Sequence, residues 1–273
     1  MLKQRIITGV ILALVVVGSI LYADSTWISI LFAGVLFAAA RELIALTLNP
    51  AVWVSVLVAA AFALLFWWSQ PFITTQLHYW QALAGLVAWI LIAGCLPFYR
   101  HSGKLPLLMR VILLGLGLDL LWICVHGLVF LHQNFGQGEW LLLYLLSLVW
   151  VADIGAYFSG HRFGKHKLAP TISPGKTWEG VGGGVLANLI WILFVYQLSA
   201  GWGLGLLEFI LIGLSTSVIS VVGDLFESIL KREAGVKDSG KLLPGHGGVL
   251  DRIDSLIAAS PVFVAGTFLA GSL

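Results

Sequence analysis

Long apolar segments recur along almost the whole chain and constrain its fold more than any other feature. A membrane-spanning helix needs about 20 mostly apolar residues, because it must cross a hydrocarbon core about 30 Å thick. Of the 273 residues, 59% are hydrophobic and only 10% are charged, and nine segments meet this requirement. They cover residues 5–22, 27–46, 50–69, 79–98, 108–131, 140–159, 179–198, 204–226 and 255–272. The sequence therefore predicts an all-α polytopic integral membrane protein with about nine transmembrane helices.

The first apolar segment has a second interpretation as a signal peptide, since Lys3 and Arg5 precede it. It runs unbroken to Tyr22 and lacks a convincing small-x-small cleavage site, so a transmembrane helix is the better interpretation. The polar connections between the segments are short, and we expect no separate soluble domain.

Basic residues are distributed unevenly between the two ends of the predicted helices. If the amino terminus is cytoplasmic, all 15 Lys and Arg fall at the inner ends or in the inner connections. The outer turns near residues 23–26, 70–78, 132–139 and 199–203 contain none. Cytoplasmic connections of membrane proteins are enriched in Lys and Arg, so we expect a cytoplasmic amino terminus and an external carboxyl terminus.

Charged residues are concentrated in the second part of the chain. Residues 1–105 are predicted to form a transmembrane scaffold, and residues 106–273 a catalytic region with cytoplasmic loops at 160–178 and 228–254. The second of these loop segments holds five Lys or Arg and four Asp or Glu, interleaved with glycines. Such a density of charge beside a membrane indicates a functional site.

Several charged residues fall within or at the ends of apolar segments. Asp119 lies within the fifth segment and Asp153 near the inner end of the sixth. A carboxylate in a membrane helix is costly, so each is a functional candidate. For Asp119 a structural role, protonated or hydrogen-bonded, is the better interpretation because nothing nearby supports a function, whereas Asp153 lies near other charges and is predicted to contribute to substrate binding. Arg41 and Glu42, at an inner helix end of the scaffold, are interpreted as an ion pair.

The loop at 160–178 contains Gly175-Lys176-Thr177, which has the ending of a Walker phosphate loop. The Walker pattern needs a glycine five positions before Gly175, but Pro170 stands there. We also expect no β-strand in this loop, and the phosphate-loop interpretation is therefore excluded.

The basic residues of the same loop have two interpretations. Arg162, Lys165 and Lys167 either only set the topology and attract anionic headgroups, or they serve the function, and both interpretations stay open. Lys176 and Glu179 lie where the loop enters the next helix. We predict that these two side chains face a site.

One face of the helix predicted at 204–226 becomes polar and then acidic toward its inner end. Residues at steps of three or four share a face of a helix. The polar face consists of Gly213, Ser217, Ser220, Asp224 and Glu227.

Asp251 and Asp254, at the start of the last helix, lie three residues apart and share a face. Asp251 could cap this helix with Asp254 as the distal half of a capping box, and capping is compatible with metal binding. Capping does not explain Asp224, so we predict that Asp224 and Asp251 hold a divalent cation. Oxygen ligands favour magnesium over zinc, and Cys95 and Cys124 lie in apolar runs without neighbouring ligands. Further ligands are expected among Asp153, Glu227 and Asp254.

The loop between these two helices has glycines suited to binding an anion. Gly247 and Gly248 let backbone N–H groups approach an anion closely, because they carry no Cβ and can adopt positive φ. His246, beside them, is predicted to line the site. Positive charges for an anion are available from Lys231, Arg232, Lys237 and Arg252.

Together these residues resemble the motif of the phosphatidate cytidylyltransferases, or CDP-diacylglycerol synthases. The matching positions are Ser228-x-Leu230-Lys231-Arg232, Lys237-Asp238, His246-Gly247-Gly248 and Asp251-Arg252-x-Asp254. This chain also resembles a second element of the family in the segment Ser173-Pro174-x-Lys176-Thr177-x-Glu179-Gly180. The resemblance is specific over residues 173–180 and 228–254 and only generic over the first hundred residues.

The resemblance implies transfer of a cytidylyl group from CTP to phosphatidic acid, with CDP-diacylglycerol and pyrophosphate as products and Mg²⁺ as cofactor. Phosphatidate is largely dianionic at pH 7, since the second pKa of a phosphate monoester is about 6, and such a nucleophile needs no general base. The expected catalytic residues are Lys176, Asp224, Asp251, Arg252 and Asp254. The expected substrate-binding residues are Asp153, Ser173, Lys176, Glu179, Lys231, Arg232, Lys237, Asp238, His246, Gly247 and Gly248.

Other activities fit the residues less well. CDP-alcohol phosphotransferases have a motif that opens with Asp-Gly, and no aspartate of this chain is followed by glycine. A membrane transporter would distribute ionisable residues through the bilayer midplane, whereas here they gather at one face. A cytidylyltransferase of an isoprenoid or archaeal lipid phosphate would use the same chemistry and stays open.

The expected partners are CTP, phosphatidic acid and membrane lipid, and no nucleic acid. The expected location is a bacterial cytoplasmic (inner) membrane, with the site on its cytoplasmic face. The sequence leaves open whether a second cation such as K⁺ joins Mg²⁺ and whether the protein forms a homodimer.

Overall fold

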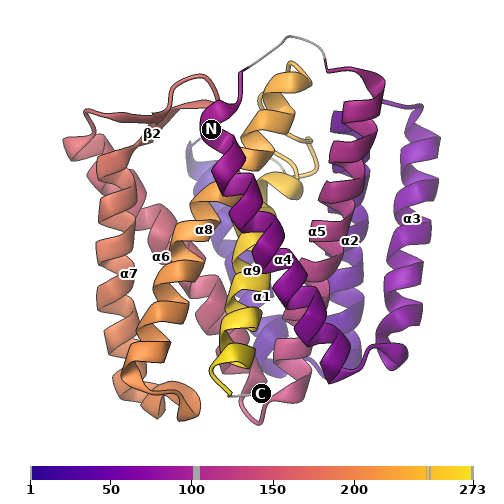
Figure 1. Cartoon of the computed structure of the whole chain (residues 1–273). Helices are drawn as coiled ribbons and strands as arrows, with labels where there is room; N and C mark the ends of the chain where they lie inside the picture. Colours follow the sequence, from indigo (N-terminus) through magenta and orange to yellow (C-terminus); the bar gives the residue numbers. More distant parts are fainter. Residues whose placement is uncertain (1, 101–104, 244, 246, 272–273) are drawn as a thin grey trace. The chain divides into compact units, whose positions relative to one another are not determined.

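The computed structural model describes residues 2–100, 105–243, 245 and 247–271. Within these residues the chain forms nine α-helices and one two-stranded sheet, coloured in chain order in Figure 1. The helices are α1 (Leu2–Tyr22), α2 (Ser25–Thr47), α3 (Val52–Ser69), α4 (Thr75–Cys95), α5 (Leu107–Asn134), α6 (Gly138–Phe163), α7 (Trp178–Ser199), α8 (Leu206–Glu233) and α9 (Leu250–Leu269). Helices α2 to α9 are long and apolar enough to cross a membrane, and α1 contains a shorter apolar stretch, Gly9–Tyr22. The predicted polytopic, helical membrane protein is confirmed.

Helices α8 and α9 extend furthest beyond the apolar segments that predicted them. Helix α8 continues to Glu233, although its apolar segment ends at residue 226, and α9 begins at Leu250 instead of residue 255. Hydropathy marks only the part of a helix that is apolar, whereas charged turns outside it can remain helical. Lys231 and Arg232 lie in the last turn of α8, where positive charge is favoured by the helix dipole. The charged loop is therefore shorter than expected and covers residues 234–249.

A β-hairpin lies between α6 and α7, and the expectation of no strand in this loop was wrong. Strands β1 (Lys167–Ala169) and β2 (Ser173–Thr177) pair antiparallel. The hairpin is closed by Trp178, whose N–H donates to the His166 carbonyl at 3.0 Å. Ile172 in the turn is 3% exposed, and this buried apolar side chain anchors a loop that is otherwise mostly polar.

The chain divides into two compact units. The first comprises residues 1–78, 101–143 and 229–254, and the second comprises residues 79–100, 144–228 and 255–273. Most of α4 belongs to the second unit and the charged segment 229–254 belongs to the first, and the expected division into scaffold and catalytic region stays a prediction. Each unit holds part of the predicted site residues.

In the first unit, α2 packs against α3 and α5. Small residues permit the close approach, since Ala40 on α2 and Ala59 on α3 are fully buried. Gly117 on α5 has the same role, because a Cβ atom added there would lie 2.8 Å from a methyl carbon of Leu43. This packing holds in place the end of α2 that carries Glu42.

In the second unit, a buried asparagine connects three helices. Asn188 on α7 is fully buried, and its Nδ2 donates to the Leu148 carbonyl on α6 at 2.9 Å and to Ser217 Oγ on α8 at 2.7 Å. Buried amides need such partners, so these bonds favour one rotation of α8 against α6 and α7. Helix α8 carries Asp224, and the asparagine therefore contributes to its orientation.

Helices α6 and α7 also pack through Gly180 and Gly184, whose small-xxx-small spacing is typical of helix-packing faces. A Cβ atom added at Gly184 would lie 2.8 Å from the Ala152 carbonyl oxygen, and one added at Gly180 would lie 3.1 Å from the Ala156 carbonyl oxygen. Both neighbours are backbone atoms of α6. The two glycines therefore form a packing face of α7 against α6.

We expect Gly184→Ala to lower the apparent melting temperature of the purified protein, because the added methyl group must push the α6 backbone away. Overpacking of this kind destabilises by about 1–3 kcal/mol. Gly182→Ala is the matched control, since nothing lies within 4 Å of its added Cβ and alanine has the higher helix propensity. Equal melting temperatures for the two variants would contradict the packing role of Gly184.

Candidate active site

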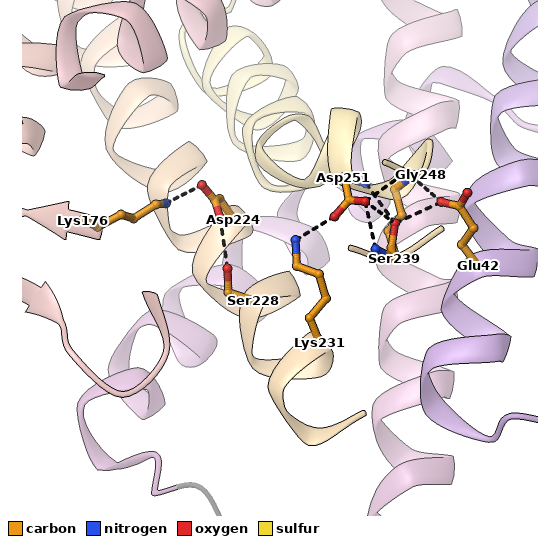
Figure 2. A network of polar contacts seen from close by, with 9 residues as sticks. Glu42, Lys176, Asp224, Ser228, Lys231, Ser239, Gly248 and Asp251 are labelled. Atoms are coloured by element: carbon orange, nitrogen blue, oxygen red, sulfur yellow. Dashed lines mark hydrogen bonds and ion pairs between the residues drawn. The ribbon is translucent and has the colours of Figure 1, made fainter. Parts of the chain in front are cut away.

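A carboxylate on α8 forms the centre of a polar cluster in the second unit. Lys176 Nζ lies 2.6 Å from Asp224 Oδ2, and Ser228 Oγ donates to Asp224 Oδ1 at 3.2 Å (Figure 2). The Lys176 and Asp224 side chains are 23% and 31% exposed, so solvent or substrate can reach the pair. We call these three residues the Asp224 cluster.

The local sequence explains how the Asp224 cluster is held. Asp224 and Ser228 are four residues apart on α8 and therefore lie on one face of the helix. Lys176 is the penultimate residue of β2, directly before Thr177, which caps α7 by accepting a bond from the Gly180 N–H at 3.1 Å. The hairpin and the helix cap thus present the lysine to α8.

A cavity of about 500 Å³ opens beside the Asp224 cluster within the second unit. This volume is in the range of small-molecule sites. Lys176, Asp224 and Asp153 line the cavity, so the structure brings together three of the residues predicted from the sequence. Glycines, alanines and valines of α6 to α8 form much of the remaining wall, and they leave room for a ligand.

Two lining residues were missed by the sequence analysis. Tyr157 and His161 lie on α6 with parallel rings whose centroids are 6.1 Å apart, and both line the cavity. They follow Asp153 at steps of four residues, so all three share a face of α6. Extending the helical periodicity from Asp153 would have found them.

The structure does not place Glu179 or Ser173 among the residues that line this cavity. Glu179 Oε1 lies 2.6 Å from His166 Nδ1, and the Glu179 carboxylate also accepts a bond from the His166 N–H. These contacts close the base of the hairpin. Ser173 is half-buried at the start of β2. Both residues thus support the hairpin that carries Lys176.

A second carboxylate, Asp251, forms the centre of a cluster in the first unit. Lys231 Nζ donates to Asp251 Oδ1 at 2.8 Å (Figure 2). Asp251 Oδ2 accepts from the Ser239 N–H and the Gly248 N–H, each at 2.8 Å, and from Ser239 Oγ at 2.9 Å. The Asp251 side chain is 6% exposed and that of Lys231 is 12% exposed. We call these four residues the Asp251 cluster.

The glycine turn before α9 adopts the conformation that the sequence predicts. Gly247 has φ of 82°, and a Cβ atom added there would lie 2.6 Å from Asp251 Oδ2. The Gly248 N–H does bind an anion, but that anion is the Asp251 carboxylate of the protein itself. The predicted site residue His246 lies outside the described residues.

Glu42 contacts the Asp251 cluster, and its predicted ion pair with Arg41 was wrong. Its carboxylate Oε2 accepts from the Leu250 N–H at 2.8 Å and from Ser239 Oγ at 3.1 Å. Adjacent residues of a helix point in different directions, which explains why the two neighbours do not pair. The contacting residues are about 200 positions away in sequence, so no local pattern could reveal them. The only available signal was a carboxylate within an apolar helix.

The other predicted residues differ in their exposure to solvent. Lys237, Asp238 and Arg252 are exposed, whereas Arg232 and Asp254 are half-buried. Asp119 is exposed on α5. Among the described residues, no group of three or more His, Cys, Asp or Glu is arranged to hold a metal ion. Asp224 and Asp251 belong to different units, so their joint role as metal ligands stays a prediction.

Comparison with known proteins relates almost the whole chain to one family. The model of the cytidylyltransferase family matches residues 3–269. A phosphatidate cytidylyltransferase of Pseudomonas aeruginosa is 43% identical over 278 aligned positions, which cover 99% of this chain and 98% of that protein. A protein of the same name from Haemophilus influenzae is 56% identical over 130 positions, or 46% of this chain and 45% of the relative. One from Brucella suis is 40% identical over 207 positions, or 73% of this chain and 72% of the relative.

Proposed function

We propose that this chain, which belongs to the cytidylyltransferase family, transfers a cytidylyl group from CTP to phosphatidic acid. The products are CDP-diacylglycerol, used in phospholipid biosynthesis, and pyrophosphate. The observation that carries the proposal is the near-complete alignment with the Pseudomonas aeruginosa phosphatidate cytidylyltransferase. The helices are long and apolar enough for a membrane enzyme, as a lipid substrate requires.

The charges of the two clusters suit this reaction. An oxygen of the lipid phosphate attacks the α-phosphorus of CTP, a new P–O bond forms, and the bond to the β-phosphate breaks to release pyrophosphate. The difficulty is to bring a dianion against a triphosphate, so catalysis consists mainly of positioning and charge neutralisation. Lys176 and Lys231 supply ammonium groups that are already held in place by Asp224 and Asp251. We assign phosphate binding to these two lysines.

Magnesium fits the donor chemistry of the two clusters. Mg²⁺ prefers oxygen ligands and is usually held by one or two carboxylates together with substrate phosphates and water, so a cage of three protein ligands is not required. Asp224 and Asp251 are the proposed carboxylate ligands. When bound, the ion would neutralise charge on the triphosphate. Each carboxylate has a lysine ammonium on one oxygen, and this pairing with a positive charge supports the proposal.

We further assign the protein to a bacterial inner membrane with the site on its cytoplasmic face. The relatives named above are bacterial. The predicted inner ends and connections carry all 15 Lys and Arg, which supports a cytoplasmic position of the charged loops. CTP is available on this side of the membrane.

The proposal predicts that detergent-purified protein forms CDP-diacylglycerol and pyrophosphate from CTP, phosphatidic acid and Mg²⁺. Both products are measured, and the same assay is run with isoprenoid and archaeal lipid phosphates. Activity with phosphatidic acid above that with the other lipids is the expected result. Absence of product from phosphatidic acid, in protein that gives a cooperative melting transition, would refute the assignment.

A further inference from the structure

Glu42 is a buried carboxylate from a helix that the sequence analysis assigned to the scaffold. It is 3% exposed, and within the described part of the chain no Lys or Arg pairs with it. Its carboxylate accepts one bond from Ser239 Oγ (Figure 2) and another from the N–H of Leu250, the first residue of α9. A buried carboxylate is costly, and these donors are its compensation. Glu42 therefore fixes the start of α9, the helix whose second residue is Asp251.

A single hydroxyl group connects Glu42 with Asp251. Ser239 Oγ lies 2.9 Å from Asp251 Oδ2 and 3.1 Å from Glu42 Oε2. A serine hydroxyl has one hydrogen to donate, so it can serve only one of the two carboxylates at a time. The Ser239 backbone N–H, by contrast, stays on Asp251 at 2.8 Å. The hydroxyl group can therefore switch its donated hydrogen bond from Asp251 to Glu42 without a movement of the backbone.

The Glu42 carboxylate is also enclosed by the loop that precedes α9. A Cβ atom added at Gly240 would lie 2.3 Å from Glu42 Oε1, and one added at Gly248 would lie 2.3 Å from Glu42 Oε2. The two glycines thus bring the backbone against the carboxylate from both sides. The loop that donates to Asp251 through Ser239 and Gly248 is held against α2 by this contact.

We propose that Glu42 is a positioning residue for Asp251 in the reaction. It holds the Ser239 loop and the first turn of α9, and it offers the Ser239 hydroxyl a second acceptor. When Asp251 Oδ2 takes a cation or releases a donor during the reaction, the hydroxyl turns to Glu42 and no buried donor is left unpaired. This inference rests on the proposed function of Asp251.

The inference is tested with Glu42→Ala, Glu42→Gln, Ser239→Ala and the double variant Glu42→Ala/Ser239→Ala. We expect Glu42→Ala to lower kcat about 10–100-fold and to raise the Mg²⁺ concentration for half-maximal activity, as loss of a group that orients a metal ligand does. Glu42→Gln keeps an acceptor oxygen of the same reach and is expected to recover most of the activity. The double variant is expected to be no worse than the more impaired single variant. Glu208 is an exposed carboxylate at the other end of α8. The variant Glu208→Gln is the matched control, and we expect it to have wild-type kinetics.

Two further measurements separate this role from a merely structural one and from failure of the proposed function. The shift in apparent melting temperature caused by CTP with Mg²⁺, in the absence of lipid, should be smaller in Glu42→Ala than in the wild type. Without any ligand, the melting temperatures of the two single variants and the double variant should be non-additive, which reports the Glu42–Ser239 contact even if the wild type makes no CDP-diacylglycerol. Unchanged Mg²⁺ dependence in Glu42→Ala, or losses that multiply in the double variant, would overturn the inference.

Discussion

Asp251→Asn is expected to reduce the rate of CDP-diacylglycerol formation at least about 100-fold, the loss typical of removing one electrostatic group from a catalytic site. Asparagine has the size of aspartate but lacks its charge, so it is a poor ligand for Mg²⁺. The structure adds a second effect, because Asp251 also pairs with Lys231, whose side chain is 12% exposed. Removing one partner of a buried ion pair lowers the free energy of unfolding by about 3–5 kcal/mol, so the variant should also melt at a lower temperature. Initial rates and melting temperatures are measured on the same preparation.

The double variant Asp251→Asn/Lys231→Met tests whether the loss of activity is only a consequence of the lost stability. Methionine retains the apolar stem of the lysine and removes the ammonium group that Asp251→Asn leaves without its carboxylate. We expect the double variant to regain thermal stability while remaining inactive. Recovery of activity together with stability would reduce Asp251 to a structural role at the start of α9.

Hydropathy was sufficient to predict the helices, because a membrane-spanning helix must be apolar over its whole length. It failed at the helix ends, where charged turns remain helical beyond the apolar segment, as at Lys231 on α8. It also failed for the hairpin, whose strands have three and five residues and are stabilised by the buried Ile172. Short elements of this kind have no periodicity that a sequence could display.

Residue chemistry indicated side chains that the structure brings together, although their roles in a site stay predictions. Lys176, Asp224 and Asp153 do line one cavity, and Asp251 does accept bonds from the glycine turn. Glu42 was misassigned, because its partners are contributed by residues about 200 positions later in the chain. Such contacts depend on the packing of α2, which no local pattern encodes.

Lys176→Met is expected to lower kcat/KM for CTP at least about 100-fold, since it removes a positioned cation from a site that must bind a polyanion. It also leaves Asp224 without its lysine partner at 2.6 Å, so the local charge becomes more negative by one unit and repels both substrates. Steady-state kinetics with varied CTP and varied phosphatidic acid measure the effect. Asp224 keeps its bond from Ser228, and we therefore expect the melting temperature to change little.

Lys167→Met is the matched control, because Lys167 is a lysine of the same hairpin but is exposed on β1 and does not line the cavity. A surface lysine that only attracts anionic headgroups contributes about 1 kcal/mol, so its loss should change kcat/KM less than about tenfold. Equal losses in the two variants would mean that the hairpin acts through its total charge at the membrane surface. A loss confined to Lys176→Met would mean that the position of the charge beside Asp224 is what the reaction requires.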